Sequence, residues 1–314
     1  MTIRSTSTAW PLEATRRDAA CWTLLAAAAL MVAMAAPFLA GRVPLGDDLG
    51  AFHVPVRAFY AEQLARGEPF DWMPQLFCGF YLTGEGQLGG YHPLHHMLYR
   101  WLPLPWALAG EWLASYVFMA VGVALWLHRR LGRIEAALFG ALVFTWGGFN
   151  LTRFVHPNAV AVLAHLPWML WTTEIVLAES SRTRVRLAQT GLALLFGSQL
   201  LLGYPQFVWY ALQVEIAYVI FLLWRRRHRP RDGCATRTDC GQCAGCATSG
   251  WSRVVVALCV GAAIGAAQLL PTADLLARSS RRAADPAFSL WGSLHPLNLL
   301  QLVAPYLFAH RVAG

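Results

Sequence analysis

The sequence predicts an all-α membrane protein, a polytopic bundle of transmembrane helices with about seven spans. Three observations lead to this fold class. Of the 314 residues, 57% are hydrophobic, only 13% are charged, and the apolar residues gather in long runs. Ordinary soluble domains carry about 25% charged residues. A soluble globule and a disordered chain are both excluded, because neither accommodates so much apolar surface.

Seven apolar runs reach or approach the length of about 20 residues that crosses the hydrocarbon core. Because backbone polar groups in lipid must be paired within their own segment, each run should be a helix. We read the first run as an uncleaved helix, since it is longer than the hydrophobic core of a secretory signal. The predicted spans are 20–38, 105–127, 134–149, 159–177, 187–202, 207–224 and 254–270.

The distribution of basic residues predicts how the helices are oriented. All 25 basic residues are Arg, in short clusters between apolar runs, which argues against a nucleic-acid-binding surface. One alternating set of segments carries 16 of them and the opposite set, although longer, carries 9. The Arg-rich set comprises 1–19, 128–133, 179–186 and 225–253, and the opposite set comprises 41–104, 150–158, 203–206 and 271–314. The positive-inside rule then places the N-terminal tail in the cytoplasm of a multi-pass protein.

This orientation divides the chain into a cytoplasmic tail at 1–19, a transmembrane domain at 20–285 and a final segment at 286–314. We expect the final segment to be either an outer segment or the start of a further span, which suggests a fragment of a longer chain. Within the domain, the outer loop at 41–104 is far longer than ordinary connections and should be folded or functional.

Residues 51–66 of the outer loop have the apolar spacing of a helix. We predict an amphipathic helix that lies in the outer membrane interface, with Pro55 tolerated in its first turns. The face expected to be apolar comprises Phe52, Val56, Phe59, Tyr60 and Leu64, whereas His53, Arg57, Glu62 and Gln63 are expected largely elsewhere.

Several short motifs occur in a fixed order relative to the predicted spans. They are Asp47-Asp48, Trp72-Met73-Pro74, Cys78-Gly79-Phe80, Gly86-Gln87, Tyr91-His92-Pro93-Leu94, His156 with Pro167-Trp168, Gly203-Tyr204-Pro205-Gln206, Gln268-Leu269-Leu270-Pro271 and Arg278-Ser279-Ser280-Arg281. In this order the sequence resembles the YfhO-type bacterial membrane proteins of the GT-C glycosyltransferase superfamily. The resemblance covers most of 20–285. Because YfhO-type proteins are much longer, it implies a truncated chain.

The resemblance implies a transferase in the bacterial inner membrane that takes a sugar from a polyprenyl-phosphate-linked donor. The acceptor would be an envelope glycopolymer, lipid or protein on the outer face. The resemblance implies an acid in the first outer loop that serves as the catalytic base or supports a metal, and the matching positions are Asp47 and Asp48. As a base, a carboxylate there takes the proton of an acceptor hydroxyl. The departing phosphate needs cationic or dipolar groups. Candidates on the predicted outer side are Arg153, His156, Arg278, Arg281 and Arg282, and the family match adds Tyr204 and Gln206 as cavity-lining residues.

Two other functions stay open. A lipid-linked-saccharide flippase or transporter would depend on polar residues inside the spans, such as Glu215, and would be indifferent to Asp47 and Asp48. A non-catalytic membrane assembly protein would keep the fold alone, with both acids as solvated loop residues. Glu174 and Glu215 both lie within predicted spans, where an acid either makes a structural hydrogen bond or serves a substrate.

Two metal sites are weighed against plainer interpretations. His92, His95 and His96 either ligate a divalent cation together with Asp47 or Asp48, or pack at the membrane interface. Cys234, Cys240, Cys243 and Cys246 in the predicted cytoplasmic loop either bind zinc or an iron–sulfur cluster, or belong to an insertion without metal. The seven Arg residues of that loop should attract anionic lipids. Cys21, Cys78 and Cys259 are expected to be inert or packed.

Overall fold

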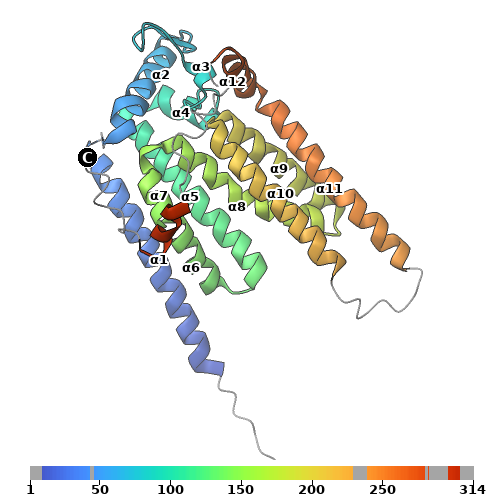
Figure 1. The fold of residues 1–314 in the computed structure, drawn as a ribbon. Coiled ribbons are helices and arrows are strands. Elements are labelled where there is room, and N and C mark those ends of the chain that lie inside the picture. Colours follow the sequence, from blue (N-terminus) through green and yellow to red (C-terminus); the bar gives the residue numbers. More distant parts are fainter. Residues whose placement is uncertain (1–8, 43–45, 229–238, 280–281, 283–295, 305–314) are drawn as a thin grey trace, which may run out of the picture. The chain divides into compact units, whose positions relative to one another are not determined.

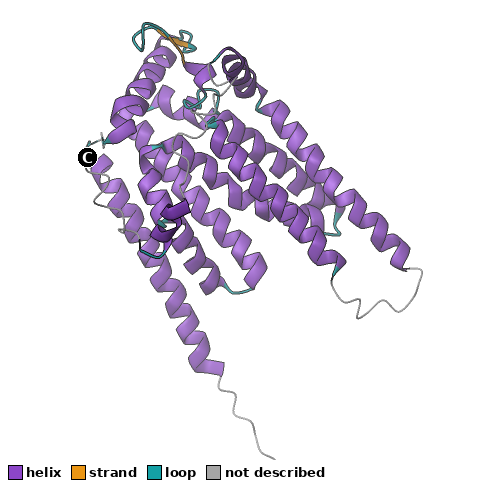
Figure 2. Ribbon diagram, viewed as in Figure 1, coloured by secondary structure: helices purple, strands orange, loops and turns teal. Residues whose placement is uncertain are grey.

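A computed structural model describes residues 9–42, 46–228, 239–279, 282 and 296–304 of the chain. Most of these residues are helical, and among them strand is confined to one two-stranded antiparallel hairpin (Figures 1 and 2). The all-α class is confirmed. The chain divides into two units, Met1–Thr272 and Ala273–Gly314. The described part of the second unit contains the end of α12 and a short 3-10 helix, Pro296–Leu302.

Five helical segments of the described chain are long and apolar enough to cross a membrane. They are Arg16–Phe38, Leu104–Leu131, Ile134–Val155, Pro157–Ala178 and Pro205–Arg227, and they correspond to the first, second, third, fourth and sixth predicted spans. The elements that form them are α1 (Ala9–Leu39), α5 (Leu104–Leu131), α6 (Ile134–Thr145) with α7 (Gly148–Thr152) and η2 (Arg153–Val155), α8 (Pro157–Ala178) and α10 (Pro205–Arg227). A membrane protein is therefore supported by several independent segments.

Proline and glycine mark the ends of these helices. Helices α5, α8 and α10 each carry Pro in the first turn, where the missing N–H would have had no helical partner. Helix α5 ends at Gly132, whose left-handed conformation terminates the helix without the cost of a Cβ atom. Local sequence therefore sets where the chain enters and leaves these spans.

The predicted seventh span, 254–270, is not one straight helix. Helix α11 (Asp239–Ile264) is followed by α12 (Ala266–Arg278), and the apolar segments Gly250–Ile264 and Ala266–Arg278 are bent by 75° relative to each other. The break falls at Gly265, where an added Cβ would overlap the side chain of Leu200. This bent pair counts as a sixth span only if both helices cross together.

The start of α11 also changes the predicted Arg- and Cys-rich loop. Because α11 begins at Asp239, the C-terminal half of that loop has a helical backbone. Cys240, Cys243 and Cys246 belong to this helix, but their side chains lie outside the described structure, as does the whole of Cys234. The predicted metal site at these four cysteines is therefore outside the described residues.

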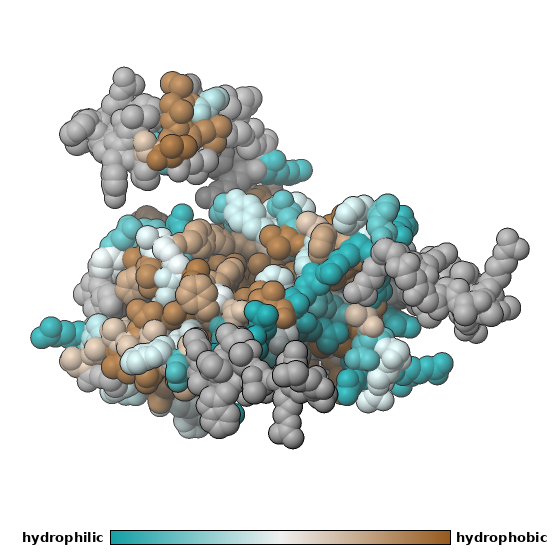
Figure 3. Space-filling view, turned by 90° about the horizontal axis from the view of Figure 1, so that it is seen from below, coloured by the Kyte–Doolittle hydropathy of each residue, from teal (hydrophilic) through white to brown (hydrophobic). Residues whose placement is uncertain are grey.

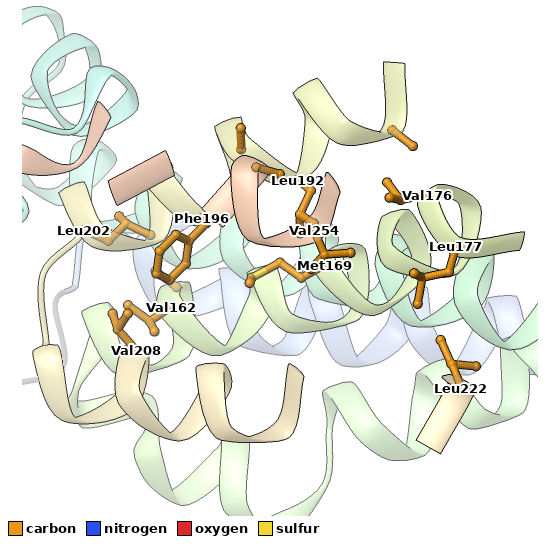
Figure 4. Packing of buried hydrophobic residues seen from close by; sticks show 14 residues of the cluster. Val162, Met169, Val176, Leu177, Leu192, Phe196, Leu202, Val208, Leu222 and Val254 are labelled. Atoms are coloured by element: carbon orange, nitrogen blue, oxygen red, sulfur yellow. The ribbon is translucent and has the colours of Figure 1, made fainter. Parts of the chain in front are cut away.

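Helix α9 (Arg182–Leu201) covers the predicted fifth span but is not among the five segments. Three Arg residues in its first two turns lower its mean hydropathy. Its length of 20 residues corresponds to about 30 Å, the thickness of the hydrocarbon core. Leu192 and Phe196 pack with Val162 and Met169 of α8 and with Val254 of α11 (Figure 4). Helix α9 thus lies within the bundle.

The predicted outer loop is a folded cap, defined here as residues 46–103. It contains η1 (Leu49–His53), α2 (Val54–Arg66), β1 (Trp72–Met73), β2 (Phe80–Tyr81), α3 (Leu82–Glu85) and α4 (Pro93–Trp101), gathered at one end of the long helices (Figure 1). Its apolar core joins α2, α4 and the first residues of α5, among them Phe59, Tyr60, Leu82, Tyr99 and Leu108. The apolar face of α2 is therefore covered by protein rather than by lipid.

The prediction that His53 and Arg57 lie away from the packed face is wrong. Both are buried, at 1% and 0% exposure, because Arg57 meets a buried acid that the sequence did not single out and His53 contacts Arg57. Arg57 donates two hydrogen bonds to Glu111 of α5, from Nε at 2.8 Å and from Nη2 at 2.6 Å. The Tyr99 hydroxyl donates to the same carboxylate at 2.5 Å, and His95 Nε2 lies 3.7 Å from it. Buried charges require such complete pairing.

The two predicted acids inside the spans also make structural hydrogen bonds. Glu174 of α8 pairs with Arg130 Nε at 2.9 Å and Arg129 Nε at 3.4 Å of α5, and it accepts from the Tyr218 hydroxyl of α10. Glu215 of α10 is fully buried and accepts from the Thr173 hydroxyl of α8. Each acid therefore holds neighbouring helices together.

Replacing Arg57 by Met should lower the stability of the protein by about 3–5 kcal/mol, because Glu111 is left as an uncompensated buried charge. The double variant Arg57→Met/Glu111→Gln should recover most of this loss. Thermal unfolding in one detergent measures both.

The matched control is Arg66→Met, which removes an ion pair whose side chains, Arg66 and Glu62, are 58% and 54% exposed. Its cost should stay below about 1 kcal/mol. Equal melting temperatures for Arg57→Met and Arg66→Met would show that the buried pair contributes nothing special.

Candidate functional site

The candidate site begins where the cap begins, at the two predicted catalytic acids. Asp47 has a left-handed backbone with φ of 55° and an exposed side chain. Asp48 follows it in a helical conformation and leads into η1. Asp48 Oδ2 lies 3.2 Å from His156 Nε2, at the junction of η2 and α8. The Asp48 side chain is 60% exposed and that of His156 only 13% exposed, so the acid faces solvent while the imidazole is held in the fold.

A second imidazole lies behind the first. The rings of His53 and His156 are 5.7 Å apart, and His53 Nδ1 is 3.3 Å from Arg57 Nη1. Because a guanidinium only donates, His53 Nδ1 must accept this hydrogen bond. Burial, and next the charge of Arg57, lower the pKa of His53 to about 3. A neutral imidazole therefore connects the exposed acid, through a continuous line of contacts, to the buried ion pair.

The turn between α9 and α10 closes one side of the site. The Tyr204 N–H donates to the Gly86 carbonyl oxygen of the cap at 2.5 Å. Gly203 precedes it with φ of 80°, and an added Cβ there would overlap the same carbonyl oxygen. Tyr204 itself has φ of 56°, a left-handed conformation that costs a residue other than glycine of the order of 1–3 kcal/mol. Contacts with the cap hold this strained residue in place.

Charges from three elements act on the Tyr204 hydroxyl. Burial raises the pKa of Tyr204, the charge of Arg153 opposes this, and the carboxylates of Asp48 and Glu85 raise it further. The Tyr204 ring is also 6.4 Å from the ring of His156. Two carboxylates, a guanidinium, an imidazole and a phenol therefore belong to one electrostatic neighbourhood. We call it the outer cluster: Asp48, Glu85, Arg153, His156 and Tyr204.

Sequence reasoning did not single out Glu85. Its carboxylate accepts a hydrogen bond from the Gln87 N–H at 3.0 Å, and Gln87 in turn offers its carbonyl oxygen to Asn158 of α8 at 3.0 Å. The available signal was its position directly before the Gly86-Gln87 motif. This position places the acid where the cap meets α8 and the α9–α10 turn.

Of the remaining predicted binding residues, Gln206 lies in the first unit, whereas Arg278, Arg281 and Arg282 lie in the second. Gln206 is exposed, and its amide donates to the Tyr210 hydroxyl of the same helix at 2.9 Å. Arg278 belongs to the second unit and pairs there with Asp274 at 2.9 Å. Arg282 is exposed, and Arg281 lies outside the described residues. Of the predicted set, the structure brings together Asp48, Arg153, His156 and Tyr204.

Two of the three cap histidines contact each other, since the rings of His92 and His95 are 5.2 Å apart. His92 Nε2 lies 2.8 Å from Ser198 Oγ of α9, His95 contacts Glu111, and His96 is exposed. Within the described ranges, no group of three or more His, Cys, Asp or Glu side chains could hold a metal ion. Cys21, Cys78 and Cys259 are all exposed free thiols. Of the two expectations, inert or packed, the second is therefore wrong, and the first stays a prediction.

Comparisons with protein families, with curated proteins and with solved structures find no match to this chain. The chemistry of the outer cluster is that of proton transfer beside an anion. A partly exposed carboxylate in contact with an imidazole can accept a proton, and a neighbouring guanidinium and phenol can stabilise negative charge.

The buried histidines make stability depend on pH. Burial lowers the pKa of His53 and of His92 to about 3, so the folded protein keeps both neutral at pH 5. The unfolded chain protonates them near pH 6.5, so stability falls as pH falls below that value. Each histidine should cost about 2 kcal/mol between pH 7 and pH 5. Melting temperatures at pH 7, 6 and 5 measure the loss.

The variant His53→Asn keeps an acceptor for Arg57 but cannot protonate, so its melting temperature should fall less steeply with pH than that of the wild type. His96→Asn removes an exposed histidine of the same cap and should leave the slope unchanged. If His53→Asn and the wild type lose stability in parallel, His53 is not the group that carries this dependence.

Proposed function

We propose that this protein is a membrane glycosyltransferase of the GT-C type. It transfers a sugar from a polyprenyl-phosphate-linked donor to an envelope acceptor at the outer face of the bacterial inner membrane. The observation that carries the proposal is the 3.2 Å contact between Asp48 and His156 at the solvent-exposed beginning of the cap. The resemblance to YfhO-type proteins, which implies a catalytic acid in the first outer loop, supports the same residue.

The proposal assigns seven crossings, with α9 as the fifth and the bent α11–α12 pair as the seventh. The Arg distribution supports a crossing at α9. If α9 did not cross, Arg225, Arg226 and Arg227 at the end of α10 would lie on the opposite side from the Arg-rich α5–α6 and α8–α9 turns. Seven crossings keep these clusters together in the cytoplasm, as the positive-inside rule requires, with the N-terminus there as well.

In the proposed reaction, the acceptor hydroxyl oxygen attacks the anomeric carbon and its proton passes to the Asp48 carboxylate. The bond between the anomeric carbon and the phosphate oxygen breaks, and the lipid phosphate leaves with the electron pair. Burial and the two nearby carboxylates raise the pKa of Tyr204, so its hydroxyl stays protonated and can donate to the departing phosphate. Arg153 supplies a positive charge beside it.

Two further ligands are predictions from the sequence alone. They are a divalent cation at the outer site and zinc or an iron–sulfur cluster at the four cysteines of the Arg-rich loop. The proton transfer described above uses only side chains of the outer cluster.

Replacing Asp48 by Asn should lower sugar transfer by about 100-fold to 10,000-fold, because the general base is lost while the shape of the side chain is kept. The variant should be expressed in place of the wild type, and formation of the glycan product should be measured at matched protein level and melting temperature. Asp47→Asn should retain more activity, since His156 contacts the other acid.

The control is Glu68→Gln, because Glu68 is an exposed acid of the same cap and lies just after α2. Persistence of the glycan in Asp48→Asn and in the double variant Asp47→Asn/Asp48→Asn would refute the catalytic assignment. A flippase would tolerate the loss of Asp47 and Asp48 but would depend on Glu215. A non-catalytic assembly protein would tolerate the loss of the two acids and of Glu215.

The orientation can be tested with single cysteines. Cys78 is an exposed thiol of the cap, so a chain that keeps only this cysteine should react with a membrane-impermeant maleimide in intact cells. A chain that keeps only Cys234 should react after lysis alone. The opposite pattern would place the cap in the cytoplasm and remove the basis for an outer-face transferase.

A further inference from the structure

A groove of about 750 Å³ runs along the outside of the bundle between α5, α8 and α9. Its walls are largely apolar and include Trp168 and Trp171 of α8 and Leu187 and Leu194 of α9. The two leucines are 69% and 55% exposed in the protein alone, so the groove opens outward from the helices rather than into their core. In a bilayer this surface faces lipid.

The groove has a different polar group at each end. Arg129, Glu179 and Arg184 line one end, whereas His165 and Ser198, whose Nε2 and Oγ atoms are 2.9 Å apart, line the other. Along α9, the 14 residues from Arg184 to Ser198 correspond to about 21 Å. The hydrocarbon of one leaflet is about 15 Å thick. The groove is therefore long enough for a complete acyl chain.

The Arg-bearing end has an excess of positive charge. Its acids are already engaged, since Glu174 pairs with Arg129 and Arg130, and Glu179 lies 3.5 Å from Arg184. Seen from below, hydrophilic residues are interspersed with apolar ones on this face (Figure 3). Further Arg residues that these acids do not neutralise are Arg133, Arg182 and Arg186.

These cations do not stabilise helix α9. Positive charge in the first turn of a helix is unfavourable, because the N-terminal end of the helix dipole is positive. Arg182 and Arg184 nevertheless occupy the first turn of α9, which contains no acid, and only Arg184 has an acid nearby, Glu179 at 3.5 Å. An external anion would offset this repulsion.

We propose that the groove binds an anionic phospholipid, with the phosphate between Arg129 and Arg184 and one acyl chain along α9 toward Ser198. The charge excess selects an anionic headgroup, since a zwitterionic lipid would add its own cation to the same end. The apolar walls select a ligand with a chain over free phosphate. This site lies away from the outer cluster and does not depend on the proposed sugar transfer.

Retention of lipid by the purified protein tests the headgroup contact. Native mass spectrometry should show dioleoylphosphatidylglycerol bound in preference to dioleoylphosphatidylcholine. In Arg129→Gln/Arg184→Gln, retention of phosphatidylglycerol should fall by about 25-fold, since each Arg contributes about fivefold near an anionic surface. Glu174 keeps its pair with Arg130 in this variant, so the fold is retained.

The matched control is Arg133→Gln/Arg182→Gln, which removes the same charge from the same end without altering the lining of the groove. It should lose clearly less phosphatidylglycerol than Arg129→Gln/Arg184→Gln, because it removes only the general attraction of the charged end and no direct contact with the headgroup. Equal loss of phosphatidylglycerol in both double variants would mean that net charge alone attracts the lipid. Equal retention of phosphatidylglycerol and phosphatidylcholine by the wild type would mean that the headgroup is not recognised. Either result overturns the proposal.

A steric variant tests the chain. Gly191 lines the groove, and an added Cβ would meet only Thr172 Cγ2 at 3.7 Å, an ordinary contact. Gly191→Leu should therefore fold, fill the groove and abolish retention of phosphatidylglycerol, whereas Gly191→Ala should retain it. Glycerol 3-phosphate should not raise the melting temperature of the wild type. Retention by Gly191→Leu, or stabilisation by glycerol 3-phosphate, would refute a site for an acyl chain.

Discussion

Two hydrogen bonds between the Arg57 guanidinium and the Glu111 carboxylate fix the cap on the transmembrane helices. Both groups are excluded from water, so neither tolerates loss of the other, and any displacement of α2 along α5 would leave two buried charges unpaired. Tyr99 and His95 bring α4 to the same carboxylate. One acid in the first turns of a span thus sets the position of the cap.

The outer cluster inherits its geometry from this pairing. Arg57 contacts His53, and the short helix η1 connects His53 to Asp48. The position of the exposed acid is therefore fixed relative to the buried ion pair. The opposite side of the cap is tied down separately, because Thr83, Gly86 and Gln87 offer backbone carbonyls to α12, to the α9–α10 turn and to α8. Residues far apart in sequence therefore meet in a rigid surface, which is what preorganised proton transfer needs.

The spans were predictable and the cap interior was not, for one physical reason. Each spanning segment must by itself satisfy the bilayer's requirement for apolar side chains and paired backbone groups. Hydropathy alone therefore predicted the five helices that are long and apolar enough to cross a membrane. Glu111 lies in an otherwise apolar run and its partner is 54 residues away, so no local pattern reveals the pair. Arg57 was therefore expected away from the packed face of α2. The motifs did indicate Asp48, His156 and Tyr204, but Glu85 emerged only from the three-dimensional proximity of its charge to Tyr204.

The acids inside the spans are engaged within the bundle, which is why both proposed sites lie at the ends of the first unit. Glu111, Glu174 and Glu215 are each bound by side chains of neighbouring helices and are buried within the bundle. The ionisable groups that remain accessible are at the ends, with Asp48 60% exposed in the cap and Arg184 73% exposed at the start of α9. These two groups have opposite charge and lie at opposite ends of α8, which begins beside His156 and ends beside Glu179. Because α8 spans about 33 Å, the two exposed groups are more than one Debye length apart at physiological salt, so their direct interaction is largely screened.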